Sequence, residues 1–197
     1  MPMREQLRNF KKERIMQEAG RLFHARGFGG TSLEAIADSM GMTKPFVYGV
    51  YDRKSDILFD ISLRVSTLSL EAVEAASQAA GSPRDRLVRM AEGLAAVCME
   101  HRVSVAVFFR EEGLLDPEHL VVIHEVKGRI DEVFARLLED GVGSGDFEID
   151  DLRVAALAIG GMISWSYSWY RPGGRLSAQE IRAHMTGYAL RIAGARE

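Results

Sequence analysis

The segment TSLEAIADSMGMTKPFVYGVYDRK, at positions 31–54, constrains the fold of this chain more than any other, because two helix starts flank a turn within it. Thr31 and Glu34 form the T-x-x-E pattern of a capping box, in which a hydroxyl and a carboxylate satisfy free N–H groups of the first turn. The box predicts a helix that begins at Ser32 or Leu33. Apolar residues then recur every three or four positions and give this helix one apolar face.

A turn and a second helix complete the pattern. Gly41 follows the last apolar position and can close the first helix in the left-handed conformation at little steric cost. Thr43 is placed to cap a second helix that reaches Lys54, and Pro45 is tolerated in its first turn. About three residues between two helices is the spacing of a helix-turn-helix, whose second helix enters the major groove of DNA. The alternative is a solvated helical hairpin with two ordinary core tyrosines.

The charge distribution is compatible with local DNA binding. Hydroxyls and lysines are frequent in the second helix, and these groups commonly donate to DNA phosphates. The whole chain has a net charge of −3, whereas residues 1–56 hold ten Lys and Arg against seven Asp and Glu. A small basic head on an acidic body can bind DNA locally, although the whole chain is a poor nonspecific DNA binder.

The remaining composition predicts a cytoplasmic protein. We recognise no signal peptide, and no apolar run reaches the ~18 residues that a membrane helix needs. Cys98 is the single cysteine, which excludes an internal disulfide. Its apolar helical context predicts a small buried side chain rather than a nucleophile.

The rest of the chain predicts an all-α fold of about nine helices. Residues 1–12 are predicted to form a flexible basic arm, and residues 13–26 an amphipathic helix that Gly27 ends. Further helices are predicted over residues 55–80, 83–101, 116–138, 152–170 and 177–193, with a short apolar segment at 104–115 and a loop at 141–145. Ser82 with Asp85, and Ser177 with Glu180, are placed to cap two of these helices. We expect residues 1–56 to be a DNA-binding domain and residues 57–197 to bind an effector and dimerise.

Residues 15–58 match an ordered pattern of a known family. The matching residues are Ile15, Ala19, Leu22, Phe23, Gly27, Thr31, Ile36, Ala37, Gly41, Thr43, Tyr48, Tyr51, Lys54, Ile57 and Leu58. The pattern resembles the N-terminal DNA-binding domain of the TetR family of bacterial transcription regulators. The chain departs from it at Gly49 and Val50, where the family often has an aromatic residue and a histidine, so we carry no contact over to these positions.

The resemblance implies a set of DNA-binding residues. Phosphate contacts are implied for Thr31, Thr43, Tyr48 and Lys54, and contacts with base edges for Lys44, Pro45 and Phe46. With Ser32 and Tyr51, which lie in the same segment, these residues form the predicted DNA-binding set.

The C-terminal body is predicted to form a homodimer through its last two helices. These helices carry small-residue and apolar faces, which suit a four-helix bundle between two copies. The resemblance to the TetR family implies the same arrangement. Two recognition helices about 34 Å apart match successive major grooves of a palindromic operator in double-stranded DNA.

The same body is predicted to bind an effector. The stretch WSYSWYRPGGRLSAQEI, within the last fifty residues, resembles the TetR branch that responds to acyl-CoA thioesters. The resemblance implies a repressor that a small hydrophobic effector releases from DNA. The candidate ligand-binding residues are Phe108, Phe109, Arg110, Arg129, Met162, Trp165 and Trp169. The alternative for each is ordinary core packing or, for the arginines, a solvated surface.

The alternative function is a small all-helical enzyme, or a ligand-binding protein without DNA binding. His119 and His124 are five positions apart, rather than the four that place two imidazoles on one helical face. His124 is followed by Glu125, but the second histidine of an H-E-x-x-H site is missing. The sequence therefore predicts no enzyme, no catalytic residue, no metal site and no cofactor.

Overall fold

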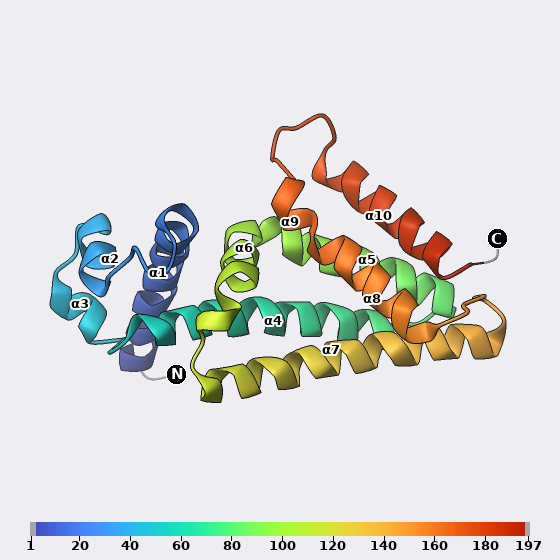
Figure 1. The fold of residues 1–197 in the computed structure, drawn as a ribbon, viewed down its shortest axis with the longest axis horizontal. Coiled ribbons are helices and arrows are strands. Elements are labelled where there is room, and N and C mark those ends of the chain that lie inside the picture. The colour runs from blue at the N-terminus through green and yellow to red at the C-terminus, as the bar shows by residue number, and fades with distance from the viewer. Residues whose placement is uncertain (1–2, 196–197) are drawn as a thin grey trace. The chain divides into compact units, whose positions relative to one another are not determined.

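The computed structural model describes residues 3–195, and every regular element in that range is helical (Figure 1). The elements are α1 (Met3–Arg26), α2 (Leu33–Ser39), α3 (Lys44–Tyr48), α4 (Lys54–Gln78), α5 (Pro83–Glu100), α6 (Arg102–Glu111), η1 (Glu112–Leu114, a 3-10 turn), α7 (Pro117–Ser144), α8 (Leu152–Ser164), α9 (Ser166–Trp169) and α10 (Ala178–Ile192). The all-α prediction is confirmed, and the helix predicted over residues 152–170 is divided into α8 and α9. No helix in the described range is long and apolar enough to cross a membrane.

The chain forms two compact units that do not follow its order along the sequence. The first unit contains the residues up to Arg64 together with Val103–Ile123. The second unit contains Val65–Arg102 and the residues from His124 onward. Helices α4 and α7 each pass from one unit into the other, and α6 lies in the first unit.

The core of the first unit is built around α1. Ile15, Ala19 and Phe23 repeat every four residues along α1, so they share one face, and all three are buried. Ile36 of α2 and Val47 of α3 are fully buried in the same unit. α1 packs against α2, and α2 packs against α3, so the apolar stripe of α1 supports the helix-turn-helix.

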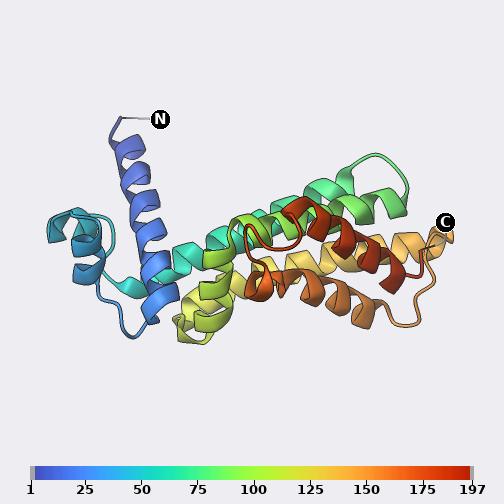
Figure 2. The ribbon, with the colours of Figure 1, turned by 90° about the horizontal axis from the view of Figure 1, so that it is seen from above.

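The prediction of a flexible arm at the N-terminus is wrong for residues 3–12, which are the first three turns of α1. Arginine, glutamate, glutamine, leucine and lysine are strong helix formers, and neither glycine nor proline interrupts them before Gly20. Figure 2 shows this half of α1 projecting past α2 and α3. Residues 1 and 2 of the predicted arm lie outside the described residues.

Helix α6 is tied to the end of α1 within the first unit. The Arg110 guanidinium donates to the carbonyls of Phe23 and His24, at 3.1 Å for His24. Glu111 is buried, and its carboxylate accepts a hydrogen bond from the N–H of Phe28 at 3.4 Å and from Arg110 at 2.8 Å. The carbonyl of Phe23 also accepts the N–H of Gly27 at 2.9 Å, whereas the carbonyl of His24, in the last turn of the helix, gains its donor from Arg110.

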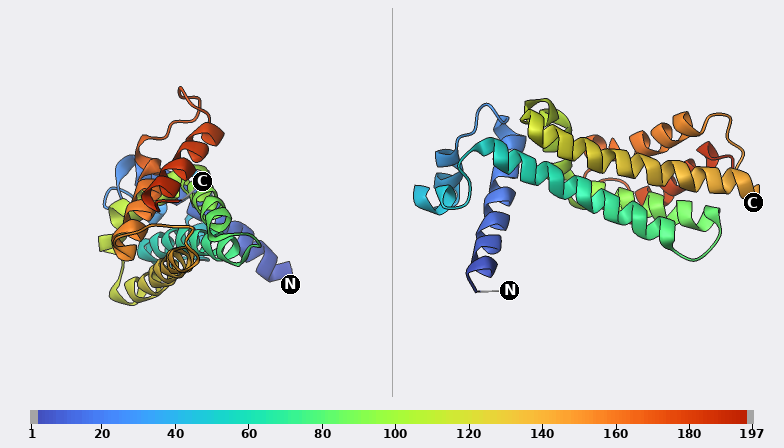
Figure 3. Two further views of the ribbon diagram at one scale, coloured as in Figure 1. Left: turned by 90° about the vertical axis from the view of Figure 1, so that its right-hand side faces the viewer. Right: turned by 90° about the horizontal axis from the view of Figure 1, so that it is seen from below.

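The second unit packs α5, α8 and α10 around a common core. α5 and α10 begin with capping boxes, Ser82 with Asp85 and Ser177 with Glu180, as their sequences predict. The C-terminal part of α4 and α7 run side by side (Figure 3), and both contribute buried side chains to this core. Cys98 is buried in α5, and burial raises the pKa of its thiol to about 12, which leaves it unreactive.

The prediction of a loop over residues 141–145 is wrong for its first four positions, because α7 continues to Ser144. Gly145, with a φ of +79°, follows the end of the helix. Gly141 lies against Phe147, whose ring carbons come within 2.0 Å of the position that a Cβ at residue 141 would occupy. The glycine is therefore needed for the close packing of Phe147 against α7, rather than for a flexible connection.

Candidate functional sites

The turn of the helix-turn-helix is closed by two backbone hydrogen bonds. Gly41 has a φ of +64°, and its N–H donates to the carbonyl of Asp38 at 3.0 Å. The N–H of Met42 donates to the carbonyl of Ala37, also at 3.0 Å. This pair of bonds is the Schellman motif, which satisfies the last carbonyls of α2 and sets the direction of the chain into α3.

Ser32, rather than the predicted Thr31, caps α2. The Ser32 hydroxyl is exposed and accepts the N–H of Ala35 at 3.1 Å. Thr31 is only 2% exposed, and its hydroxyl donates to the carbonyl of Gly27 at 3.0 Å. The prediction failed because Thr31 and Ser32 are adjacent hydroxyl residues. The hydroxyl of Thr31 bonds back to Gly27 within the loop after α1, and Ser32 is the residue that caps α2.

Helix α3 has an exposed edge at its N-terminal end and is held in the core by one buried side chain. Thr43, Lys44 and Pro45 are exposed, and the hydroxyl of Thr43 makes no capping bond to its own helix. Phe46 is half-buried, whereas Val47 is fully buried and fixes the helix to the core. The exposed edge has the residue types that contact phosphates and base edges in major-groove helices.

Tyr48 joins α3 to α2. Its hydroxyl donates to the carboxylate of Glu34 at 2.7 Å. This hydrogen bond raises the pKa of Tyr48 and lowers the pKa of Glu34. The tyrosine ring remains exposed at the surface, beside the edge formed by residues 43–45.

The predicted second helix is too long, because α3 ends at Tyr48 and α4 begins at Lys54. Gly49 forms the C-cap of α3, which places Tyr51 and Lys54 outside it. Tyr51 is buried and donates to Asp60 at 2.7 Å, and burial is the main reason that its pKa is raised.

Lys54 holds the loop between α1 and α2. Its ammonium donates to the carbonyls of Phe28 and Thr31 at 2.8 and 2.9 Å, and lies 4.4 Å from the centre of the Phe28 ring. Both carbonyls belong to the segment between α1 and α2; that of Phe28 also accepts the N–H of Thr31 at 3.3 Å, whereas that of Thr31 has no helical donor. The geometry assigns the lysine a structural part within the head.

We expect Lys54→Met to lower the free energy of unfolding by about 2–3 kcal/mol, because the partly buried carbonyls of Phe28 and Thr31 lose a charged donor. Denaturant unfolding checks this value. The exposed Lys44→Met serves as the control and should change stability by less than about 0.5 kcal/mol. If Lys54→Met instead keeps wild-type stability and only weakens DNA binding, Lys54 is a phosphate contact and the structural assignment is wrong.

The structure does not gather the predicted ligand-binding residues in one place. Phe108, Phe109 and Arg110 lie on α6 in the first unit, and Phe108 is buried. Arg129, on α7, pairs with Glu74 of α4 at 2.6 Å. Phe108, Phe109 and Arg110 therefore belong to another compact unit than Met162, Trp165 and Trp169, whereas Arg129 belongs to the same unit as those three.

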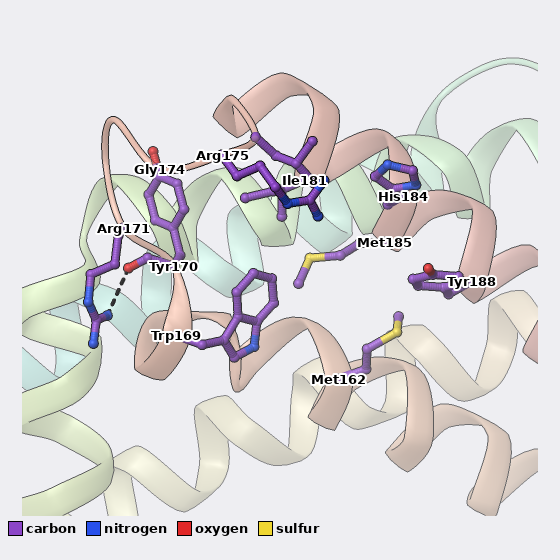
Figure 4. A pocket seen from close by; sticks show the side chains of 11 residues that line it. Met162, Trp169, Tyr170, Arg171, Gly174, Arg175, Ile181, His184, Met185 and Tyr188 are labelled. Atoms are coloured by element: carbon purple, nitrogen blue, oxygen red, sulfur yellow. Dashed lines mark hydrogen bonds between the residues drawn. The ribbon is translucent and has the colours of Figure 1, made fainter.

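A pocket of about 700 Å³ opens in the second unit between α8–α9 and α10 (Figure 4). Of the predicted residues it contains Met162 and Trp169, while Trp165 is not part of its wall. The complete lining is Met162, Trp169, Tyr170, Arg171, Gly174, Arg175, Leu176, Ile181, His184, Met185 and Tyr188. Sequence reasoning missed the α10 residues of this wall, although their spacing of three and four positions places them on one helical face.

The helices that form the pocket also carry exposed apolar side chains. Val154 and Leu157 of α8 are 61% and 60% exposed, and Trp165 is 60% exposed. Tyr188 and Ile192 of α10 are also exposed. Isolated apolar residues are normal on protein surfaces, but several on two adjacent helices indicate an interaction face.

A further cluster in the first unit was not predicted from the sequence. Asp56, Asp116 and His119 bring ligand-type atoms within 4.8 Å of one another. Arg53 already pairs with Asp56 at 2.9 Å and with Asp116 at 3.1 Å, and the His119 ring stacks on Phe59. A guanidinium among the carboxylates opposes a metal ion by charge, so we interpret the cluster as an ion-pair network between α4 and α7.

An all-helical fold in the described residues, with a helix-turn-helix that exposes Thr43, Lys44 and Tyr48 at its second helix, is typical of DNA-binding regulators. The sequence model of the "Bacterial regulatory proteins, tetR family" matches residues 15–61. That of the "Tetracyclin repressor-like, C-terminal domain" matches residues 80–193. The chain belongs to the TetR family of transcription regulators, as its resemblance predicts.

Relatives and solved structures agree with this assignment. The HTH-type transcriptional repressor KstR2 of Mycolicibacterium smegmatis is 24% identical over 87% of this chain and 84% of its own length. A TetR-family regulatory protein from Rhodococcus RHA1 is 30% identical, with a TM-score of 0.88 over 95% of this chain and 98% of that one. The structure of AibR with isovaleryl coenzyme A and operator DNA is 27% identical, with a TM-score of 0.80 over 90% and 97% of the two chains.

Proposed function

We propose that this TetR-family regulator is a homodimeric repressor that binds a palindromic operator and leaves it when an acyl-CoA thioester binds. The observation that carries operator binding is the exposed edge of α3, held on the buried Val47. We assign DNA reading to residues 1–56, and dimerisation and effector binding to residues 57–197. The proposal is for a regulator, not an enzyme.

The proposed DNA contacts are the exposed members of the predicted set. Ser32, Thr43 and Tyr48 offer hydroxyls that suit phosphate oxygens, and Lys44, Pro45 and Phe46 suit base edges. We assign Thr31, Tyr51 and Lys54 a supporting role inside the DNA-binding domain rather than contacts with DNA. Their side chains hold the loop before α2 and the segment after α3, so they position the contacting residues.

We propose that α8 and α10 form the dimer interface. The exposed Val154 and Leu157 would be covered by the same helices of a second copy, as a two-fold interface requires. Gly160 and Gly161 on α8 support a close approach, since a Cβ on either would meet no atom of this chain within 4 Å. Two-fold symmetry also matches the proposed palindromic operator.

The pocket between α8–α9 and α10 is the proposed effector site. Met162, Ile181 and Met185 supply apolar surface for an acyl chain, and Arg171 and Arg175 supply charge for phosphates. The similarity to AibR, whose structure contains isovaleryl coenzyme A, supports a thioester as the ligand class. The effector would release DNA only to the extent that it binds the released arrangement more tightly than the bound one.

Operator binding is tested by selecting duplexes from a random DNA pool with the full-length protein. We expect a pseudo-palindrome whose half-sites are about one helical turn apart. Selection of no sequence, or of an asymmetric site bound by one protomer, would contradict the proposed repressor.

The effector is tested by native mass spectrometry with isovaleryl-CoA, free CoA and isovalerate at equal concentrations. We expect a thioester adduct that Arg175→Gln weakens about tenfold, because a charged hydrogen bond to phosphate is lost. Arg136→Gln, an exposed change on α7, is the control and should bind as the wild type does. If neither isovaleryl-CoA nor longer acyl-CoA thioesters bind, the thioester proposal is wrong, while operator binding remains separately testable.

A further inference from the structure

The first three turns of α1 carry no buried side chain. Every residue from Met3 to Phe10 is exposed, and the first fully buried position of the helix is Ile15. In Figure 2 and in the right panel of Figure 3, this part of the helix extends past α2 and α3. A helix that gains no burial in its own unit is available for contact with another molecule.

Three cations lie on one face of this extension. Arg4, Arg8 and Lys11 are separated by four and three positions, which places them in one row on a helix. The Lys11 ammonium lies 5.1 Å from the centre of the Phe46 ring. Because Phe46 belongs to α3, this contact shows that the basic row is on the side of α1 that faces the recognition helix.

The charge of this row is not neutralised by the neighbouring acids. Arg4 and Arg8 make no ion pair within the described residues. A hollow of about 390 Å³ beside Arg8 is lined by Glu5, Asp52, Asp56 and Asp60, of which Asp56 pairs with Arg53 at 2.9 Å and Asp60 with Lys12 at 2.8 Å. Residues 3–12 hold four Lys and Arg against one Glu, so this part of α1 retains a net positive charge beside α3.

We propose that the basic row of α1, Arg4, Arg8 and Lys11, is a second DNA-binding element that contacts the phosphate backbone next to the groove occupied by α3. The partner is duplex DNA, because charge complementarity and the Lys11–Phe46 contact place the row beside the helix that reads the operator. The contacts extend the footprint and add affinity without adding base specificity. This inference rests on the proposed operator binding.

The test uses the full-length protein with both arginines changed, Arg4→Gln/Arg8→Gln, and measures operator affinity as a function of salt. The association constant K for the operator falls as salt rises, and each lost phosphate contact should make the plot of log K against log salt less steep by about 0.9. Two contacts per protomer in a dimer therefore predict a slope smaller by about 3.6, and binding at least tenfold weaker at about 0.1 M salt. The selected operator sequence should not change.

Arg14→Gln is the matched control, because Arg14 is exposed on the same helix and lies over the Phe10 ring on another face. It should keep the wild-type slope. On a shorter duplex that contains only the base pairs contacted by α3, the double variant and the wild type should have the same affinity and the same salt slope. Equal slopes for the double variant and the wild type on the long duplex would overturn the proposal.

A second experiment distinguishes DNA from an anionic membrane, since Met3, Leu7 and Phe10 form an exposed apolar row about 100° around the helix from the basic row. Sedimentation with phosphatidylserine vesicles is expected to show no binding by the wild type. Vesicle binding that the double variant loses, together with an unchanged DNA slope, would overturn the DNA assignment. If the proposed repressor function is wrong, the wild type itself will select no operator. That outcome differs from both unchanged DNA slopes and vesicle binding.

Discussion

The double change Thr43→Ala/Lys44→Ala should weaken operator binding about a hundredfold or more. Each contact to a phosphate or base edge contributes about 1–3 kcal/mol, and the dimer loses both contacts twice. Fluorescence anisotropy with the selected operator measures the loss. The fold should be unaffected, because both side chains are exposed and Thr43 makes no capping bond.

Two observations decide how that result is interpreted. The thermal midpoint of the variant should stay within about 2 °C of the wild type, since exposed substitutions usually change stability by less than about 0.5 kcal/mol. Arg136→Ala removes a positive charge on α7 and should leave operator affinity unchanged at moderate salt. Wild-type affinity in the double variant would show that α3 does not meet the operator through its exposed edge.

The second large effect is expected from Leu157→Glu on α8. Leu157 is 60% exposed in the single chain, so a carboxylate is tolerated there by the folded protomer. In the proposed interface the same carboxylate would be buried without a partner, which costs several kcal/mol on each side of a two-fold axis. We therefore expect a folded monomer at micromolar concentration, measured by analytical ultracentrifugation.

Loss of the dimer should also weaken operator binding by at least a hundredfold, because two half-sites are no longer bound by one linked particle. Val142→Glu makes a similar change at an exposed valine of α7 and should leave both the dimer and operator binding intact. A Leu157→Glu protein that remains a dimer would contradict an interface through this face of α8. Its circular dichroism should match the wild type, which excludes simple unfolding as the cause.

Local chemistry explains which parts of the fold were predictable. The Gly41 turn and the capping boxes at Ser82 and Ser177 depend on hydrogen bonds that span no more than a few residues, and the structure has them as predicted. The apolar face of α1 likewise follows from a repeat of three and four residues. Family membership could be recognised because these local signals occur in a fixed order.

The errors arose where two local interpretations were available. Residues 3–12 combine strong helix formers with high polarity, and the polarity led to the prediction of an arm. The glycines after residue 140 predicted a loop, although Gly141 is a helical residue whose missing side chain admits Phe147. In both cases the secondary structure depends on the tertiary contacts of the segment, which its composition does not describe.

The sequence by itself determined the all-α fold, the turn between α2 and α3, and the family, because each depends on residues close together in the chain. Only the tertiary structure decided that Lys54 donates to the carbonyls of Phe28 and Thr31. It also decided that α6 belongs to the same unit as the N-terminal helices, and that Met162 and Trp169 line one pocket, whose lining does not include Phe108. These pairings join residues far apart in the sequence, and their geometry depends on the packing of whole helices rather than on local propensity.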